Sequence, residues 1–427
     1  MNYSVITFGC RVNQADSLSL EAELLASGCR PTGTDRADLV IVNTCSVTAS
    51  ADQGARQTIR RIARENPAAR IVVTGCYASR RQDEVAALPG VERVVPNTGK
   101  DRLISLLDLR AKRHADAVVT TAGRFGDGDG SCGARLEPGV AGRTAFTLRV
   151  QTGCAEPCTY CIIPQTRGEP RSAPLETIVR DVDLAIGAGF KEIALTGVHL
   201  GSYGRHGSSS QRLVDLLAAV SNGRDESVRF RVSSLEPMDC SAEIVSLIAE
   251  RPAFAPHFHL PLQHASDRVL ATMRRPYTLA DYDALVTGIR RRVPHSAIGS
   301  DVIVGFPGET DADFEILTQF LESSPLTHLH VFPYSDRPGT AASAMPSKVS
   351  GETVRLRAQR IRRISDALAQ RFRASQVGTR HRGLTLDDGS TVVTGNYLKL
   401  SIPTRKARNE WVEVRVASEV HGELLAS

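Results

Sequence analysis

Residues 151–168 read QTGCAEPCTYCIIPQTRG and contain a cysteine triad, Cys154, Cys158 and Cys161, with the spacing C-x3-C-x2-C. Three of the nine cysteines of this 427-residue chain thus lie within eight positions. Closely spaced thiolates are soft ligands that suit zinc or an iron–sulfur cluster. A structural zinc site takes four protein ligands, and the loop has no fourth cysteine and no histidine. Three thiolates predict a four-iron cluster with one iron open to a substrate or cofactor. Incidental free cysteines and a zinc site completed from afar are the alternatives.

The strand before this loop indicates the fold of the middle of the chain. FTLRVQT (146–152) runs directly into the cysteines, and helical patterns then alternate with apolar strands at 192–197, 229–234, 257–263, 297–306 and 328–335. Six such repeats predict a partial or complete parallel (βα)6 barrel, with its chemistry at the carboxyl ends of the strands. A long helix is expected at 352–373, with apolar positions at Ile361, Ile364, Leu368 and Phe372.

The first 110 or so residues also alternate between strands and helices. Apolar strands are expected at 3–8, 38–44, 70–75 and 91–95, and helices at 14–27, 50–65 and 79–88. Short apolar runs between helical patterns predict a doubly wound parallel sheet. The chain is therefore expected to be an α/β protein.

A second, dispersed cysteine triad follows three of these strands. Cys10 ends VITFGC, Cys45 ends VIVNTC and Cys76 ends VVTGC. Ligand sites in open α/β sheets gather outside the carboxyl ends of the strands, so the three thiols are expected to converge and to hold a second cluster with an open iron. The alternative is that cysteine is a common small buried residue. We interpret the other three as structural or incidental: Cys29, Cys132 and Cys240.

Two changes of composition divide the chain. Residues 122–143 are rich in glycine and lack periodicity, which indicates a linker. From about residue 375 the apolar residues alternate with a period of two around an expected turn at Asp388–Gly389, which predicts a small all-β module. The expected domains are 1–121, the linker 122–143, 144–373 and 374–427.

The bulk composition is that of an ordinary globular protein, with 41% apolar and 23% charged residues. No apolar run approaches the roughly 20 residues that span a membrane, and the N-terminus has no basic region typical of an export signal. We therefore expect a cytoplasmic protein, with reduced thiols and no membrane contact. Nothing in the sequence requires more than a monomer.

Clustered basic residues favour a nucleic-acid partner. Arginine binds phosphate well because its planar guanidinium is always charged. The alternative is that these are ordinary solvated helix faces. The tail supplies only Tyr397 and Trp411 as aromatic rings for stacking on bases. The basic residues are Arg56, Arg60, Arg61 and Arg64, seven arginines within 352–373, and Arg380, Arg382, Lys399, Arg405, Lys406 and Arg408.

The C-x3-C-x2-C loop after a first barrel strand, with Tyr160 between its last two cysteines, resembles the radical S-adenosylmethionine (SAM) superfamily. Together with the N-terminal triad and the β tail, it resembles the methylthiotransferase family over nearly the whole chain. The matching segments occur in order: GCRVNQADS, VNTCSVTASADQGARQTIRRI, TGCYA, GCAEPCTYCIIPQTRGEPRS, LTGVHLGSYG, RVSSLEP, LPLQHASDRVLATMRRPY, DVIVGFPGET and VFPYSDRPGTAAS. The tail resembles the RNA-binding TRAM domain more weakly.

This resemblance implies the insertion of a methylthio group at an unactivated carbon, with two 4Fe-4S clusters and SAM as cofactors. It places one cluster on Cys154, Cys158 and Cys161 and the auxiliary cluster on Cys10, Cys45 and Cys76. It also implies an electron donor such as flavodoxin or ferredoxin. Segments at the strand ends would line the SAM pocket, and no role is assigned to His264. The candidate SAM contacts are Gly197, Gly201, Ser233, Glu236, Gln263, Gly305 and Phe306.

The family divides by substrate. The segments GCRVNQ and NTCSVTASADQGARQTIRR are similar to the branch that modifies N6-threonylcarbamoyladenosine beside the tRNA anticodon, at position 37. The alternatives are the branch acting on N6-isopentenyladenosine and the one acting on an aspartate of a ribosomal protein. A reading from another class is an iron–sulfur protein that only transfers electrons or binds RNA. That reading predicts closed four-ligand clusters, which the two triads do not match.

Overall fold

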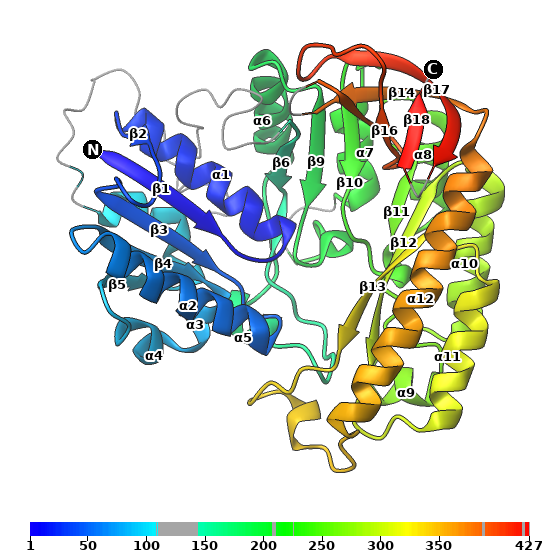
Figure 1. Cartoon of the computed structure of the whole chain (residues 1–427), viewed down its shortest axis with the longest axis horizontal. Coiled ribbons are helices and arrows are strands. Elements are labelled where there is room, and N and C mark those ends of the chain that lie inside the picture. Colours follow the sequence, from blue (N-terminus) through cyan, green and yellow to red (C-terminus); the bar gives the residue numbers. More distant parts are fainter. Residues whose placement is uncertain are drawn as a thin grey trace.

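The chain begins with a five-stranded parallel sheet whose strand order is β2-β1-β3-β4-β5 (Figure 1). The computed structural model describes residues 1–107, 109, 144–206, 211–224, 226–386, 389–420 and 423–426. The expected linker at 122–143, Cys132 and Asp388 lie outside these residues. The strands are β1 Asn2–Thr7, β2 Arg30–Pro31, β3 Leu39–Thr44, β4 Arg70–Gly75 and β5 Val91–Val95.

The helices of this first sheet are α1 Arg11–Ala26, α2 Ala49–Glu65, α3 Cys76–Arg80 and α4 Gln82–Ala86. The single helix expected at 79–88 was wrong. Two short helices meet instead at Arg81, whose φ of −132° and ψ of 56° are not helical. The first of them begins at Cys76, directly after β4, and this places the thiol of Cys76 at the end of the strand.

Helix α1 joins the sheet to the rest of the molecule, and it is buried on two faces. Leu20 and Leu24 pack with the sheet residues Tyr3 and Leu39, whereas Leu18 belongs to the core of the central domain. Figure 1 shows α1 between the first sheet and β6. Because one helix contributes to two hydrophobic cores, the relative position of the two parts is set by packing.

The middle of the chain forms an open barrel of six parallel strands, as expected. Two three-stranded sheets, β10-β9-β6 and β11-β12-β13, meet where Phe230 pairs with Phe254 and where the amide of Leu235 donates to the carbonyl of His259 at 2.9 Å. Beyond β6, Gln151–Thr152 turns away and pairs antiparallel with Arg171–Ser172. The strands are β6 Phe146–Arg149, β7 Gln151–Thr152, β8 Arg171–Ser172, β9 Glu192–Thr196, β10 Arg229–Val232, β11 His257–His259, β12 Ala297–Val304 and β13 His328–Pro333.

Helices cover the outside of this barrel (Figure 1). Some of them begin at side-chain caps that the sequence supplies: Thr278 and Asp281 form a capping box on α10, and Thr310 and Asp313 form another on α11. The helices are α5 Ile163–Arg167, α6 Leu175–Gly187, α7 Leu213–Ser221, α8 Ala242–Glu250, α9 Asp267–Thr272, α10 Leu279–Arg292, α11 Asp311–Ser323 and α12 Gly351–Gln376.

Helix α12 is the long helix expected at 352–373. Its apolar positions Ile361, Ile364 and Leu368 are buried in the core of the central domain. Phe372, the fourth expected position, packs against the core of the C-terminal module. The helix thus connects the barrel to the tail through one continuous apolar stripe.

The tail is a small closed β-barrel with the strand order β14-β15-β16-β18-β17. Its first two strands form the antiparallel hairpin that the alternating pattern predicted, with Thr385 opposite Val392. The α/β fold class with a C-terminal β module is therefore confirmed. The strands are β14 Arg380–Thr385, β15 Thr391–Thr394, β16 Lys399–Ser401, β17 Trp411–Val420 and β18 Glu423–Ala426.

Candidate active site

The N-terminal triad lies at one edge of the first sheet. Cys10 ends the loop after β1, Cys45 follows β3 and Cys76 follows β4, and these three strands are neighbours. Gly9 has a φ of +88°, and a side-chain carbon there would lie 2.5 Å from the Sγ of Cys45. Only glycine therefore lets the segment carrying Cys10 lie against Cys45.

Buried cations surround the innermost thiol of this triad. Burial opposes ionisation of Cys76, but the charges of Arg167 and Lys100 lower the pKa of its thiol. Burial, with the nearby thiols of Cys10 and Cys76, raises the pKa of Cys45 to about 11. Metal ligation requires thiolates, so a cation beside Cys76 favours the form in which this triad would bind a cluster.

Asp16 holds these cations in place from the buried face of α1. Its carboxylate lies 2.8 Å from the Nζ of Lys100, 2.5 Å from Arg149 and 3.2 Å from Arg167. Arg149 ends β6 and Arg167 ends α5, so the ion network crosses between the N-terminal sheet and the barrel. The Nδ2 of Asn97 lies 3.6 Å from the Sγ of Cys76. The N-terminal triad is thus completed electrostatically by the central domain.

The second triad lies in the loop after β7. Cys161 donates its amide to the carbonyl of Cys158 at 3.1 Å, which tightens the loop. Arg275 donates from Nη1 to the Sγ of Cys158 at 3.1 Å and forms an ion pair with Glu236. Hydrogen bonds to cysteine sulfur are among the features that tune an iron–sulfur cluster.

A buried histidine lies beside the first cysteine of this loop. The Nδ1 of His199 lies 4.0 Å from the Sγ of Cys154, and its Nε2 lies 2.6 Å from Asp239. Burial opposes protonation, but hydrogen bonds to Asp239 and Cys154 raise the pKa of His199 to about 10. Each triad therefore has positively charged groups against its sulfurs.

A cavity of about 170 Å³ lies between the two cysteine loops. The N-terminal domain contributes Val47 and Thr48, which closely follow Cys45, and the second loop contributes Tyr160, between Cys158 and Cys161. The remaining walls come from the carboxyl ends of the barrel strands: Gln263, Asp301, Ile303, Phe332, Pro333, Tyr334 and Ser335. The cavity is thus where groups from both triads could meet one substrate.

Contacts across the domain boundary hold this cavity in shape. Asp52 on α2 binds both Arg80, at 2.5 Å, and Arg337, at 3.0 Å, and only the second lies in the central domain. The amide of Ala49 also donates to the Oγ of Ser335 at 3.1 Å. All three partners of the ion cluster are nearly buried, so water competes little for these bonds.

The predicted SAM contacts divide into two groups. Ser233 is buried, and its Oγ has no hydrogen-bond partner among the described residues. Gln263 lines the cavity in a strained conformation, with a φ of 65°. Both leave polar groups for a ligand to use.

The other predicted SAM contacts have partners within the protein. Glu236 binds Arg275. The amides of Gly305 and Phe306 donate to Glu309 at 2.6 and 3.1 Å. Two further positions leave little room for a side chain: a side-chain carbon at Gly201 would collide with Asp239, and one at Gly197 would lie tightly against Gln151. The contacts of all these residues with SAM stay predictions.

Several residues of the site were not predicted from the sequence. Arg167, His199 and Arg275 approach the cysteines only because strands and helices far apart in sequence are brought together. Asp239 in turn binds His199. Arg167 lies within the quoted stretch 151–168, which was interpreted through its cysteines alone. His264, which received no role, is buried and accepts from the amide of Ser266 at 3.0 Å.

Some of the basic residues bind groups of the protein, and others are exposed. On α12, four arginines bind groups of the protein: Arg357 binds Glu309, Arg360 binds Glu315, Arg371 binds main-chain carbonyls and Arg373 binds Glu419. On α2, three arginines at helical spacing are exposed: Arg60, Arg61 and Arg64.

The two aromatic rings of the tail are engaged within the molecule. Trp411 donates from Nε1 to the carbonyl of Ser227 at 3.1 Å, and the guanidinium of Arg382 lies 4.4 Å from its ring. The guanidinium of Arg231 lies 3.6 Å from the ring of Tyr397. Both rings therefore serve to dock the β module onto the barrel.

Comparison with known proteins agrees with this architecture. A family model described as "Uncharacterized protein family UPF0004" matches residues 2–96, and a model of the Radical SAM superfamily matches residues 148–321. The threonylcarbamoyladenosine tRNA methylthiotransferase MtaB of Aquifex aeolicus is 36% identical over 421 residues, which cover 97% of this chain and 100% of that protein. The chain belongs to the MtaB family of methylthiotransferases.

Other matches place this family among its neighbours. A tRNA-2-methylthio-N(6)-dimethylallyladenosine synthase of Streptomyces avermitilis is 32% identical, over 88% of this chain and 74% of that protein. Among solved structures, the radical SAM methyltransferase TsrM of Kitasatospora setae has a TM-score of 0.55 at 16% identity, over 80% of this chain and 76% of that one. That likeness supports the fold. Within the described residues, no helix is long and apolar enough to cross a membrane.

Proposed function

We propose that this chain inserts a methylthio group at C2 of N6-threonylcarbamoyladenosine at position 37 of tRNA, giving 2-methylthio-N6-threonylcarbamoyladenosine. The observation that carries the proposal is the cavity between Val47–Thr48 and Tyr160, which lies against both cysteine loops. The MtaB relatives named for this substrate support it. These MtaB relatives are 33% to 36% identical to this chain, above the 32% of the relative named for the dimethylallyl substrate. The isopentenyl substrate and the ribosomal-protein aspartate are the alternatives.

The two triads fit the clusters that the family uses. We propose that Cys10, Cys45 and Cys76 hold an auxiliary 4Fe-4S cluster and that Cys154, Cys158 and Cys161 hold the cluster that binds SAM. When bound, the clusters and SAM supply the radical and the methylthio group. In each case the donor set is three thiols with a cationic side chain against them. Three ligands leave one iron open, which suits a cofactor that must bind substrate.

The protein's own residues would bind and orient SAM and the substrate. Ser233 and Gln263 offer polar groups toward SAM, and Glu236 would act with Arg275. Gly197, Gly201, Gly305 and Phe306 would shape the backbone at the strand ends. Aromatic and aliphatic walls would exclude water from the reacting carbon.

The exposed face of α2 is our candidate for the tRNA contact. Thr48 caps α2 and lines the cavity, so the exposed arginines Arg60, Arg61 and Arg64 lie along a helix that starts at the cavity. Phosphate binding by such a stripe positions RNA without reading its sequence. The β module at 374–427, with exposed Lys399, Arg405 and Lys406, would add a second contact.

The remaining expectations complete the proposal. The domains would be 1–121, 144–373 and 374–427, joined by a linker at 122–143. The enzyme would act as a cytoplasmic monomer and receive electrons from a donor such as flavodoxin or ferredoxin.

Nucleoside mass spectrometry of tRNA from a strain lacking the gene tests the function. Loss of the methylthio form of threonylcarbamoyladenosine, with accumulation of its precursor, is the expected result. Loss of the methylthio isopentenyl form would contradict the proposed substrate but would still support methylthiotransferase activity. No change in either nucleoside would favour the ribosomal-protein reading.

A further inference from the structure

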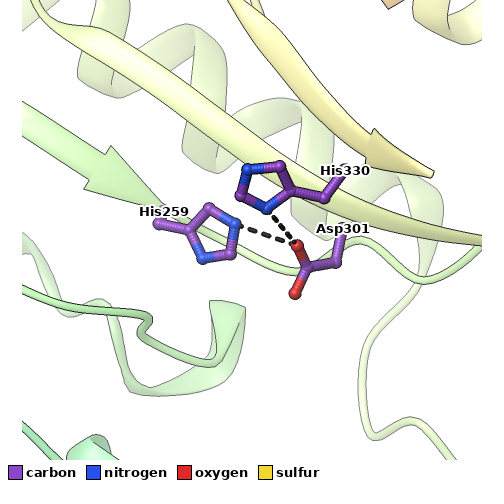
Figure 2. A group of neighbouring side chains, drawn as sticks. All are labelled: His259, Asp301 and His330. Atoms are coloured by element: carbon purple, nitrogen blue, oxygen red, sulfur yellow. Dashed lines mark hydrogen bonds and ion pairs between the residues drawn. The ribbon is translucent and has the colours of Figure 1, made fainter. Parts of the chain in front are cut away.

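A polar trio lies on the inner face of the barrel, beside the cavity. Figure 2 shows His259, Asp301 and His330 converging from β11, β12 and β13. The Oδ1 of Asp301 lies 3.0 Å from the Nε2 of His259 and 3.0 Å from the Nδ1 of His330. The cysteine chemistry described above does not use these three side chains.

The strand register explains why the trio faces inward. His259 is paired with Gly299, and Asp301 with His330, on adjacent parallel strands. Side chains alternate along a strand, and the neighbours Ile298 and Val302 are buried in the hydrophobic core. The trio therefore lies on the opposite face, toward the cavity that Asp301 helps to line.

The trio is only partly satisfied by its own contacts. Burial raises the pKa of Asp301, but the imidazoles of His259 and His330 against its carboxylate outweigh burial and lower that pKa to about 2, so the carboxylate is ionised. Both histidines contact the same oxygen, and within the described part of the chain Oδ2 has no hydrogen-bond donor. Side-chain exposure is 14% for His259, 23% for Asp301 and 56% for His330. Asp301 lines the cavity, and His330, the most exposed of the three, contacts its carboxylate from the neighbouring strand.

The surroundings combine apolar walls with polar side chains. Ile303, Phe332 and Tyr334 line the cavity beside Asp301 and suit the flat face of a purine. A group that binds here thus meets apolar walls, a carboxylate and imidazole nitrogens.

We propose that His259, Asp301 and His330 form a subsite for the polar substituent on N6 of the substrate adenosine. A ureido group would donate its N–H to Asp301, and His330 would donate to the hydroxyl or carboxylate of the substituent. A hydrocarbon substituent would leave these groups desolvated and unpaired. Sites built to hydrogen-bond a substrate can reject an analogue lacking the partner by about 10⁴-fold.

This inference rests on the proposed function, and binding measurements separate the two. Anticodon stem-loops carrying threonylcarbamoyladenosine, isopentenyladenosine or adenosine at position 37 are titrated against wild type, His330→Phe and Asp301→Asn. Wild type should prefer the threonylcarbamoyl form by at least about tenfold, or about 1.4 kcal/mol. His330→Phe and Asp301→Asn should reduce that preference to about threefold or less.

The matched control is His295→Phe, because His295 is exposed and lies just before β12, at the opposite end of the strand from the cavity. It should keep the wild-type preference. An unchanged preference in both trio variants, each verified by circular dichroism and iron content, would overturn the subsite. So would a stoichiometric non-cluster metal that is lost in Asp301→Asn, because the trio would then be a metal site. If wild type methylthiolates only the isopentenyl form, the proposed function is wrong. The binding measurements on the trio variants would still show whether the trio contacts the N6 substituent.

Discussion

The Nη1 of Arg275 lies 3.1 Å from the Sγ of Cys158, although 117 positions of sequence separate them. The same guanidinium pairs with Glu236 and donates from Nε to the hydroxyl of Tyr277 at 3.1 Å. A cationic donor on a ligating sulfur stabilises the reduced cluster, because reduction adds negative charge. We therefore propose that Arg275 is a positioning residue for the SAM cluster proposed at this loop.

We expect Arg275→Met to lower the reduction potential of that cluster and to slow SAM cleavage by about 10- to 100-fold. A redox titration followed by electron paramagnetic resonance would measure the potential. Arg274→Met is the control, because Arg274 is the adjacent arginine and is exposed. Equal potentials in the two variants would show that the contact with Cys158 has no electronic effect.

Cys158→Ala should abolish SAM cleavage while leaving the auxiliary cluster in place. Its iron content should fall to roughly half of the wild-type value, because one of two four-iron clusters is lost. Anaerobic reconstitution, iron analysis and chromatographic detection of deoxyadenosine would test this. Continued deoxyadenosine production would contradict the assignment of the SAM site.

Asp52→Ala should separate SAM cleavage from formation of the methylthio product. The substitution leaves Arg80 and Arg337 without their shared carboxylate and so loosens the N-terminal domain from the barrel. A displacement of about 1 Å can cost about 10²-fold in rate. The methylthio product should therefore fall far more than deoxyadenosine does. Asp83→Ala, at an exposed position of α4, should keep the wild-type ratio of the two products.

Arg231→Met should strongly destabilise the docking of the β module. Arg231 is fully buried, contacts Glu192 at 3.1 Å and donates to the carbonyl of Gly395 at 2.7 Å. Removing one partner of a buried ion pair costs about 3–5 kcal/mol. Urea denaturation would measure the loss. The double variant Arg231→Met/Glu192→Gln should recover part of it, and no recovery would mean that the pair is not coupled.

Glu192 should also make the free energy of unfolding depend on pH. Burial opposes its ionisation, but Arg231 lowers the pKa of Glu192 below its usual 4.5. A lowered folded-state pKa stabilises the protein above the unfolded-state pKa, and this contribution is lost as the pH falls through the folded-state value. Denaturation between about pH 6 and pH 3 should show a shallower loss of stability for Glu192→Gln than for wild type. Parallel curves would contradict this role.

The strands and most helices could be predicted because local apolar periodicity decides them. Helix α12 is an example, since Ile361, Ile364 and Leu368 recur on one face and are buried. The division at Arg81 could not be predicted, because it depends on Cys76 beginning a helix at the end of β4. The partners of the α12 arginines could not be predicted for a similar reason: carboxylates on α11 and a nearby loop bind Arg357 and Arg360.

The sequence by itself determined the two cysteine triads, the alternation of strands and helices, and hence the class of chemistry. Those features are encoded in spacing within short segments. Only the tertiary structure decided which side chains surround the sulfurs and the cavity. Arg275 reaches Cys158, and Asp301 lies between His259 and His330, because parallel strands bring residues far apart in sequence to one end of the barrel. No local pattern carries that information, since it depends on how the separate elements pack.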